Sequence, residues 1–235
     1  MAEAERQTHG VIRFIRDLLV IVLAAVVISF LPKTFLSRSF FIPSTSMERT
    51  LEVNDRVIVN QLVPNPVSLN RGDVIVFHDP GGWLNAGPTA EVTPLQHALQ
   101  FIGLAPDTSD NYLIKRVIGL PGDRVACCDA NGRMTVNGEP LDEPYAVVPD
   151  DGASVSALDF DVTVPEGSLW VMGDNRYASK DSRYNQELPT EGFVPVDDVV
   201  GRAFVLNWPI DRIGILGNYP EVFQNVPDPQ TSETE

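Results

Sequence analysis

Residues 111–141 read NYLIKRVIGLPGDRVACCDANGRMTVNGEPL and carry the clearest fold signal in the chain. An apolar run, broken only by Lys115 and Arg116, ends at a Pro-Gly-Asp turn. Two Asn-Gly pairs then follow six residues apart, and such pairs between alternating apolar residues are a strong hairpin signal. The stretch predicts a strand followed by tight antiparallel hairpins.

Short apolar runs between turns continue on both sides of this stretch, at 74–77, in EGSLWVMGDN (166–175) and in VVGRAFVLNWP (199–209). We therefore expect one mainly β domain, an antiparallel and barrel-like body over about 37–222. Residues 79–110 look like an insertion that contains a short amphipathic helix. Residues 223–235 are polar and are predicted to form a disordered acidic tail.

The composition excludes several functions. The 235 residues carry a formal net charge of −15 and no basic–aromatic stripe, so we expect no nucleic-acid partner. The two cysteines, Cys127 and Cys128, are adjacent, and no Cys/His spacing suits zinc, so no metal site is predicted. A vicinal disulfide and a pair of semi-buried thiols both fit these cysteines.

The N-terminal region contains one long apolar run, LLVIVLAAVVISFL at 18–31, which flanking residues extend to a span of about 11–36. A membrane anchor at 1–36 is the preferred interpretation; a cleaved signal peptide and a buried core helix are the alternatives. Basic residues are slightly more frequent before the run than after it, which favours a cytoplasmic N-terminus and an exported body.

Two serines stand two residues apart in FIPSTSMERTL (41–51), just after the apolar run. A serine hydroxyl needs a base before it can act as a nucleophile. His78 is next to Asp79, but neighbours on a strand point to opposite faces, so this pair is poorly arranged for a relay. Lys115 lies within an apolar strand, on the face of Leu113 and Val117.

Burial disfavours an ammonium ion and lowers the pKa of a lysine. Lowering the pKa of Lys115 to near 8 costs about 3 kcal/mol, which a single site can tolerate. A neutral Lys115 could then act as the base for Ser46. A lysine that extends from a half-buried strand toward water explains the spacing equally well.

Four blocks in order, PSTSM (43–47), RGDVIVF (71–77), KRVIGLPGD (115–123) and GDNRYASKDSR (173–183), resemble the bacterial type I signal peptidases. These are membrane-anchored Ser/Lys endopeptidases that remove signal peptides from exported preproteins after small-x-small sites. The resemblance covers about residues 10–210 apart from the insertion. The lysine base, rather than a histidine, resembles the bacterial branch of the family, and the single anchor with the insertion is similar to Gram-positive members.

The resemblance implies a role for each matching residue. Ser46 corresponds to the nucleophile, Lys115 to the general base, and Ser44 to a hydroxyl that binds the oxyanion together with the Ser46 backbone N–H. In the fourth block the resemblance implies that the Ser179 hydroxyl orients the lysine and that Asp181 and Arg183 form a supporting ion pair. The turn that presents these residues consists of Gly173, Asp174 and Asn175. Thr45 and Arg49 depart from the family pattern, in which glycine and proline are common.

We expect the substrate to pair as an added strand beside Phe41–Pro43 and the Lys115 strand. Shallow apolar pockets for small side chains would then be formed by Ile42, Met47, Leu113 and Ile114. The resemblance implies no cofactor. It also implies a single-pass protein of the cell membrane with its catalytic domain outside the cytoplasm, in contact with the lipid bilayer and close to the secretion translocon.

Two other functions fit parts of this pattern. One is a different Ser/Lys hydrolase of the self-cleaving repressor type, which shares the Ser-Met pair but lacks the anchor and the GDNR block. The other is a non-catalytic anchored β module that binds exported chains.

Overall fold

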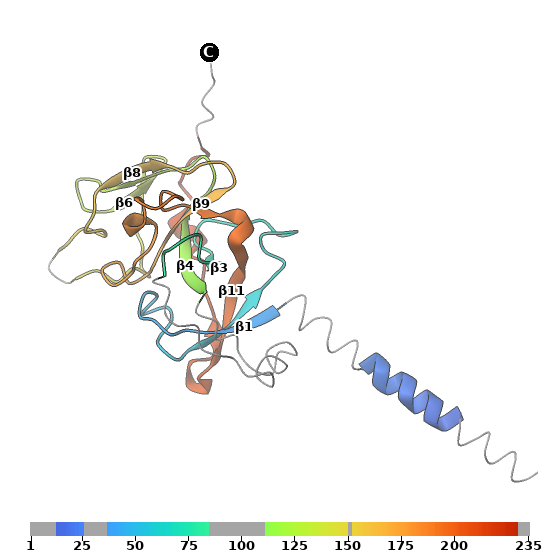
Figure 1. Cartoon of the computed structure of the whole chain (residues 1–235). Helices are drawn as coiled ribbons and strands as arrows, with labels where there is room; N and C mark the ends of the chain where they lie inside the picture. Colours follow the sequence, from blue (N-terminus) through green and yellow to red (C-terminus); the bar gives the residue numbers. More distant parts are fainter. Residues whose placement is uncertain (1–12, 26–36, 85–110, 150–151, 230–235) are drawn as a thin grey trace, which may run out of the picture.

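The computed structural model describes residues 13–25, 37–84, 111–149 and 152–229 (Figure 1). The larger of two sheets has the strand order β1-β2-β11-β3-β4-β9-β10, with β12 paired to β11. Its strands are β1 Ser37–Phe41, β2 Arg56–Asn60, β3 Val74–His78, β4 Tyr112–Gly119, β9 Ser168–Met172, β10 Val194–Pro195, β11 Val199–Trp208 and β12 Gly214–Ile215.

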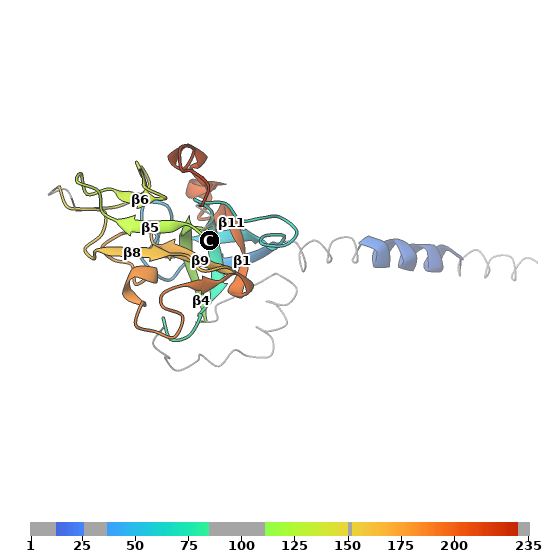
Figure 2. The same ribbon diagram turned by 90° about the horizontal axis from the view of Figure 1, so that it is seen from above.

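The smaller sheet has the order β7-β6-β5-β8 and lies on the side of the body away from β1 (Figures 1 and 2). Its strands are β5 Arg124–Cys127, β6 Met134–Val136, β7 Glu139–Pro140 and β8 Phe160–Thr163. Four 3-10 turns complete the described elements: η1 Ser182–Tyr184, η2 Val196–Asp198, η3 Ile210–Arg212 and η4 Pro220–Val222. The mainly β, antiparallel fold predicted from the sequence is confirmed.

Strand β4 pairs on both edges, but not along its whole length. It pairs with β3 over Tyr112–Arg116, whereas β9 joins its other edge only from Arg116 onward. From Leu113 to Gly119 its residues are all buried. The first half of β4 therefore keeps one backbone edge that no described strand occupies.

The two Asn-Gly pairs form turns at the edge of the smaller sheet, as predicted. Strand β5 pairs antiparallel with β6, and β6 turns back to β7 through Asn137 and Gly138, which have φ values of 52° and 85°. Positive φ at both central residues is what a two-residue hairpin of this type requires.

The end of the body differs from its prediction. Phe223 and Val226 are 7% and 9% exposed and belong to the same apolar cluster as Trp170 and Phe193. The prediction of a disordered tail from residue 223 is therefore wrong for 223–229, since two apolar side chains fix this segment to the core. Residues 230–235 lie outside the described part of the chain.

Part of the predicted anchor is a helix at 13–25, whose apolar side chains such as Phe14 and Leu23 are 68% and 65% exposed. Among the described residues, no helix meets the length and apolarity needed to cross a membrane. The other residues of the predicted 11–36 span lie outside the described ranges. So does 85–110 of the insertion, whereas Trp83 just before it is buried in the core.

Candidate active site

The segment that carries the two serines is held by its apolar neighbours. Met47 and Leu51 are fully buried in the cluster formed with β1 and β2. The backbone N–H groups of Thr50 and Leu51 both donate to the Met47 carbonyl, at 3.1 and 2.7 Å, which closes a tight turn. Burial of the residue after Ser46 therefore fixes the direction of the Ser46 side chain.

The structure brings Ser46 and Lys115 together across 69 residues of sequence. Lys115 Nζ lies 2.7 Å from Ser46 Oγ and donates a second hydrogen bond of 2.9 Å to the Ile114 carbonyl. Both side chains are buried, at 4% and 6% exposure. When the amine is neutral, the Ser46 hydroxyl can donate to Nζ, which is the contact that a general base needs.

Burial lowers the pKa of Lys115 from 10.5 to about 8. The loss of water around the ammonium is the largest cause; Asp181 and Asp174 oppose it and raise the pKa, while Arg183 lowers it further. This direction is the one expected for a lysine buried on an apolar strand. A lysine with a pKa near 8 is neutral often enough at neutral pH to accept a proton.

Ser44 lies beside the same pair. Its Oγ is 3.3 Å from Ser46 Oγ, and its side chain is exposed whereas that of Ser46 is buried. A hydroxyl at this distance from the attacking oxygen is close enough to donate to an oxyanion that forms on a bound carbonyl.

The turn after β9 holds the Ser46 segment in place. The Asn175 backbone N–H donates to the Ser46 carbonyl at 3.1 Å, and Asn175 Nδ2 donates to Glu48 at 2.9 Å. The hydroxyl of Thr50 donates to Asp174. Residues of the fourth sequence block therefore contact the first block directly, although 124 residues or more separate them.

Gly173 is required at the closest approach of these two segments. A β-carbon there would lie 2.4 Å from the Ser46 carbonyl oxygen and 2.2 Å from Ser179 Oγ, both below contact distance. Its backbone N–H donates to Asp181 at 2.9 Å. Asp181 in turn accepts two hydrogen bonds of 2.8 Å from the guanidinium of Arg183, so the predicted ion pair is present and buried.

Ser179 is also close to the pair but not bonded to it. Its side chain is 4% exposed, and within the described residues its hydroxyl has no hydrogen-bond partner. The contact to Lys115 that the resemblance implies is not formed in this conformation. A buried hydroxyl without a partner is costly, so this oxygen is available to the Lys115 amine or to a bound substrate.

Sequence reasoning missed two buried ion pairs behind the site. Arg116 donates to both carboxylate oxygens of Asp174 at 2.8 and 2.7 Å, and its guanidinium lies 4.1 Å from the ring centre of Tyr145. Arg176 pairs in the same two-pronged way with Glu143, at 2.6 and 2.7 Å. For Arg116 the only signal in the sequence was a charged residue within an apolar strand, and such a signal does not identify the carboxylate that pairs with it.

The predicted pocket residues are less accessible than expected. Ile42 and Met47 are 1% and 0% exposed, and Leu113 and Ile114 are 9% and 7% exposed, so these side chains lie beneath the surface. Phe41 is half-buried and Pro43 exposed. His78 is exposed, and the Asp79 carboxylate accepts hydrogen bonds from the backbone of residues 81, 83 and 84, so no His–Asp relay forms there.

A serine hydroxyl in contact with a buried lysine of lowered pKa is an arrangement that suits a serine hydrolase with an amine as its base. Among the described residues no cluster of His, Cys, Asp and Glu can hold a metal ion.

The model of the family "Signal peptidase, peptidase S26" matches residues 15–208. Signal peptidase I of Mycobacterium tuberculosis is 41% identical over 224 residues, which cover 86% of this chain and 75% of that protein. Signal peptidase I of Leptolyngbya laminosa is 38% identical over 188 residues, with coverages of 80% and 77%. Signal peptidase I U of Bacillus subtilis is 30% identical over 207 residues, with coverages of 86% and 91%.

The chain belongs to the bacterial type I signal peptidases of the S26 family of serine peptidases, as the four sequence blocks predicted. A solved structure of a signal peptidase I from Enterococcus faecalis covers 57% of this chain and 95% of its own, with 28% identity and a TM-score of 0.38. The family assignment depends on the sequence matches.

Proposed function

We propose that this protein is a membrane-bound endopeptidase that removes N-terminal signal peptides from exported preproteins after small-x-small sites. The observation that carries the proposal is the 2.7 Å contact between Lys115 Nζ and Ser46 Oγ in a buried environment that lowers the pKa of Lys115 to about 8. The family membership supplies the substrate class, since the relatives are named signal peptidases.

In this mechanism Ser46 Oγ attacks the scissile carbonyl carbon while Lys115 Nζ takes the hydroxyl proton. The carbonyl oxygen becomes an oxyanion that accepts hydrogen bonds from Ser44 Oγ and from the Ser46 backbone N–H. As the C–N bond breaks, Lys115 returns the proton to the leaving amine. Water then hydrolyses the acyl-enzyme by the same route, with Lys115 again as the base.

The substrate strand would enter between two open backbone edges. Ile42 exchanges backbone hydrogen bonds with residues 54 and 55, so Phe41 and Pro43, its neighbours, direct their backbone groups to the other edge. The first half of β4 has an edge that no described strand occupies. The rings of Phe40 and Tyr112 lie 5.1 Å apart, which brings the two edges close together. An extended peptide added there would reach Ser46.

The burial of Ile42, Met47, Leu113 and Ile114 fits a preference for small side chains. Side chains that are at most 9% exposed can form only the floor of a shallow depression. A large substrate side chain would have to displace packed core atoms, which costs more than burying a methyl group returns. Alanine at the sites that face this floor is the expected preference.

We further propose that residues 1–36 anchor the chain as a single span with a cytoplasmic N-terminus. The helix at 13–25 presents apolar side chains that the described residues leave exposed, and a membrane would cover them. The β body then forms the catalytic domain outside the cytoplasm, from residue 37 to the core contact of Val226. Ser46 would lie near the bilayer surface and the secretion translocon, where signal peptides emerge.

The test is cleavage of a purified preprotein in detergent by the full chain and by Ser46→Ala and Lys115→Ala. We expect the wild type to cut after a small-x-small sequence, as read by mass spectrometry. Both variants should lose about two to four orders of magnitude of kcat/KM, because removal of the nucleophile or base disables the same step. Asp161→Asn, an exposed carboxylate on the smaller sheet, is the matched control and should cleave normally.

Full activity of Lys115→Ala would exclude Lys115 as the base. An inactive wild type, tested in both detergent and bilayers, would favour the non-catalytic binding module instead.

A further inference from the structure

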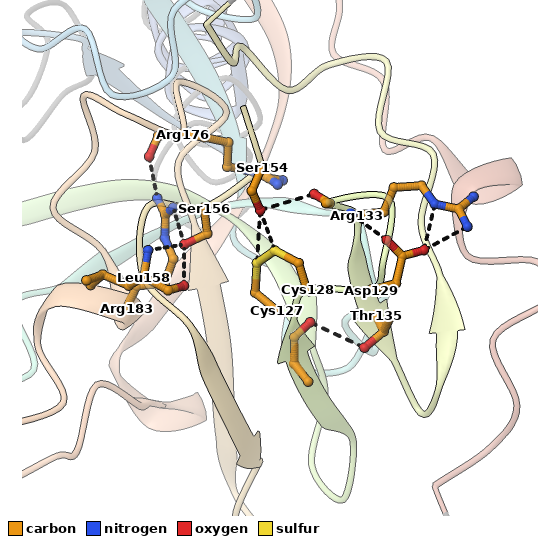
Figure 3. Close-up of a disulfide and its surroundings, with 12 residues drawn as sticks. Cys127, Cys128, Asp129, Arg133, Thr135, Ser154, Ser156, Leu158, Arg176 and Arg183 are labelled. Atoms are coloured by element: carbon orange, nitrogen blue, oxygen red, sulfur yellow. Dashed lines mark hydrogen bonds and ion pairs between the residues drawn. A yellow bond between two sulfur atoms is a disulfide. The ribbon is translucent and has the colours of Figure 1, made fainter. Parts of the chain in front are cut away.

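The two cysteines form a disulfide in the described structure, at the end of β5 (Figure 3). They are the only cysteines in the sequence. The bond closes a ring between neighbouring residues, so it restricts the unfolded chain far less than a disulfide across a long loop. Gain of stability by loop closure therefore gives little reason for this bond.

The disulfide contacts the hydroxyl of Ser154. Ser154 Oγ lies 2.7 Å from Cys128 Sγ and 3.8 Å from Cys127 Sγ, and it also donates to the Gly132 carbonyl at 3.3 Å (Figure 3). Cys128 is half-buried, whereas Cys127 is 7% exposed. Cys128 is therefore the more exposed partner of the disulfide, and Cys127 is the buried one.

The segment 154–156 connects the disulfide to the ion pair behind the proposed catalytic residues. Tyr177 donates from its hydroxyl to the Ser154 carbonyl at 2.8 Å. Two residues on, Ser156 Oγ accepts a hydrogen bond of 3.2 Å from Arg183, and Ser156 is 4% exposed. Figure 3 shows Ser154 beside the two sulfur atoms and Ser156 beside Arg183.

Arg183 links this segment to the residues around Ser46. It pairs with Asp181, which accepts the N–H of Gly173, and a β-carbon at Gly173 would already overlap the Ser46 carbonyl oxygen. The contacts therefore form one path from the sulfur atoms to the nucleophile segment, and this path is half-buried at Cys128 and Ser154 and buried from Ser156 onward.

We propose that Cys127–Cys128 is a thiol–disulfide exchange site whose oxidation state adjusts the position of Arg183, so that reduction by a dithiol lowers peptidase activity. The activity part rests on the proposed function. A dithiol's thiolate attacks Cys128 Sγ, the S–S bond breaks, and Cys127 leaves as a thiolate that takes up a proton. The second thiol of the reductant then attacks the mixed disulfide, which leaves two protein thiols and an oxidised dithiol.

Reduction changes the contacts of Ser154 directly. Two thiols need more room than a bonded sulfur pair, and Ser154 Oγ is the polar atom in contact with both sulfurs. Displacement of Ser154 moves Ser156 and loosens the hydrogen bond to Arg183. We expect a fall in kcat/KM of about threefold to tenfold, the range in which remote contacts modulate a site.

The experiment uses the full chain in detergent, treated with dithiothreitol and then reoxidised. Native alkylation followed by mass spectrometry counts released thiols, amide hydrogen exchange follows residues 171–184, and preprotein cleavage gives kcat/KM. We expect two alkylated thiols per chain, faster exchange at Gly173 and a reversible loss of activity. Cys127→Ser/Cys128→Ser should be unaffected by dithiothreitol in all three measurements.

Two single variants test the path. Ser156→Ala removes the acceptor of Arg183 and should bring the ratio of oxidised to reduced activity close to one. Ser68→Ala, at an exposed serine, should keep the wild-type ratio.

Absence of alkylation without denaturant would overturn the exchange site. Two released thiols with unchanged exchange at Gly173 and unchanged kcat/KM would overturn the coupling. If the oxidised chain cleaves no preprotein, the proposed function fails, but thiol release and hydrogen exchange still decide whether the disulfide is reducible and coupled to the 173–183 turn.

Discussion

Lys115 and Arg116 are neighbours on one buried strand, yet only the region around Arg116 supplies a carboxylate in contact with the positive charge. On the side of Ser46, the Lys115 amine contacts a hydroxyl and a backbone carbonyl but no carboxylate. On the other side, the Arg116 guanidinium is fully paired with Asp174 and stacked against Tyr145. Burial without a counter-ion lowers the pKa of Lys115, whereas burial with one raises the pKa of Arg116.

The difference gives the two side chains different roles, a reactive one proposed for Lys115 and a structural one for Arg116. A lysine that has lost water but gained no carboxylate contact has a lowered pKa, which suits the role of a base that we propose for Lys115. The rest of the fold offsets the free-energy cost of burying it. An arginine with a bound carboxylate stays charged and acts as a fixed link, here between β4 and the turn that holds Ser46. Adjacent positions on one strand can therefore serve chemistry and scaffolding because their side chains point to opposite faces.

The largest expected effect on stability comes from breaking the buried ion pair between Arg116 and Asp174. Arg116→Met leaves the Asp174 carboxylate buried without its partner, so we expect a loss of about 3–5 kcal/mol in the free energy of unfolding. The measurement is urea denaturation of the full chain in detergent, followed by tryptophan fluorescence. Arg116→Met/Asp174→Leu removes both charges and should recover most of the loss. Equal losses in the single and double variants would show that packing, rather than charge, dominates.

A gain in stability, instead of a loss, is expected when the charge of Lys115 is removed. Lys115→Met removes an amine whose pKa falls from 10.5 to about 8, a difference that corresponds to roughly 3 kcal/mol of unfavourable burial. We expect Lys115→Met to unfold at higher urea than the wild type at pH 7, although it is inactive. Because the unfolded state binds the extra proton, this gain should shrink from about pH 8 upward and vanish above about pH 10.5. A destabilised Lys115→Met at pH 7 would contradict the environment described for Lys115.

The same contrast explains which features sequence reasoning could find. The apolar run before the Pro-Gly-Asp turn predicted β4, and the Asn-Gly pairs predicted the hairpins, because these signals depend on residues close in sequence. Lys115 stood out as a charge within an apolar strand. The partner of Arg116, by contrast, lies 58 residues away at Asp174, and no local pattern identifies it.

Two further features were missed for physical reasons. The tail was predicted to be disordered because prolines and polar residues dominate it, yet Phe223 and Val226 are enough to hold it to the core. Ser179 was predicted to orient Lys115, and its hydroxyl is buried near Gly173 without reaching the amine. The resemblance implied which residue stands near the site, but not the rotamer that it adopts in the free protein.

A smaller effect is expected in the pH dependence of cleavage. Since Lys115 must be neutral to accept a proton, kcat/KM should rise with pH through about 8 and level off above it. Asp181 raises the pKa of Lys115, so Asp181→Asn should move this rise to lower pH. Asp181→Asn/Arg183→Gln should move it less, because Arg183 opposes Asp181, and the double variant leaves no unpaired buried charge. Asp161→Asn is the control; an unshifted profile in both Asp181 variants would contradict the proposed coupling.

The smallest effect is expected where burial is absent but the contact geometry is the same. Arg124 donates to both oxygens of Asp161 in the same two-pronged way as Arg116 does to Asp174, but the two side chains are 67% and 50% exposed. Water and salt screen such a pair, and ordering two long side chains opposes it. Arg124→Ala should therefore leave the urea midpoint unchanged at low and high salt, measured beside Arg116→Met. A loss as large as that of Arg116→Met would mean that contact geometry, and not removal from water, sets the contribution of an ion pair in this fold.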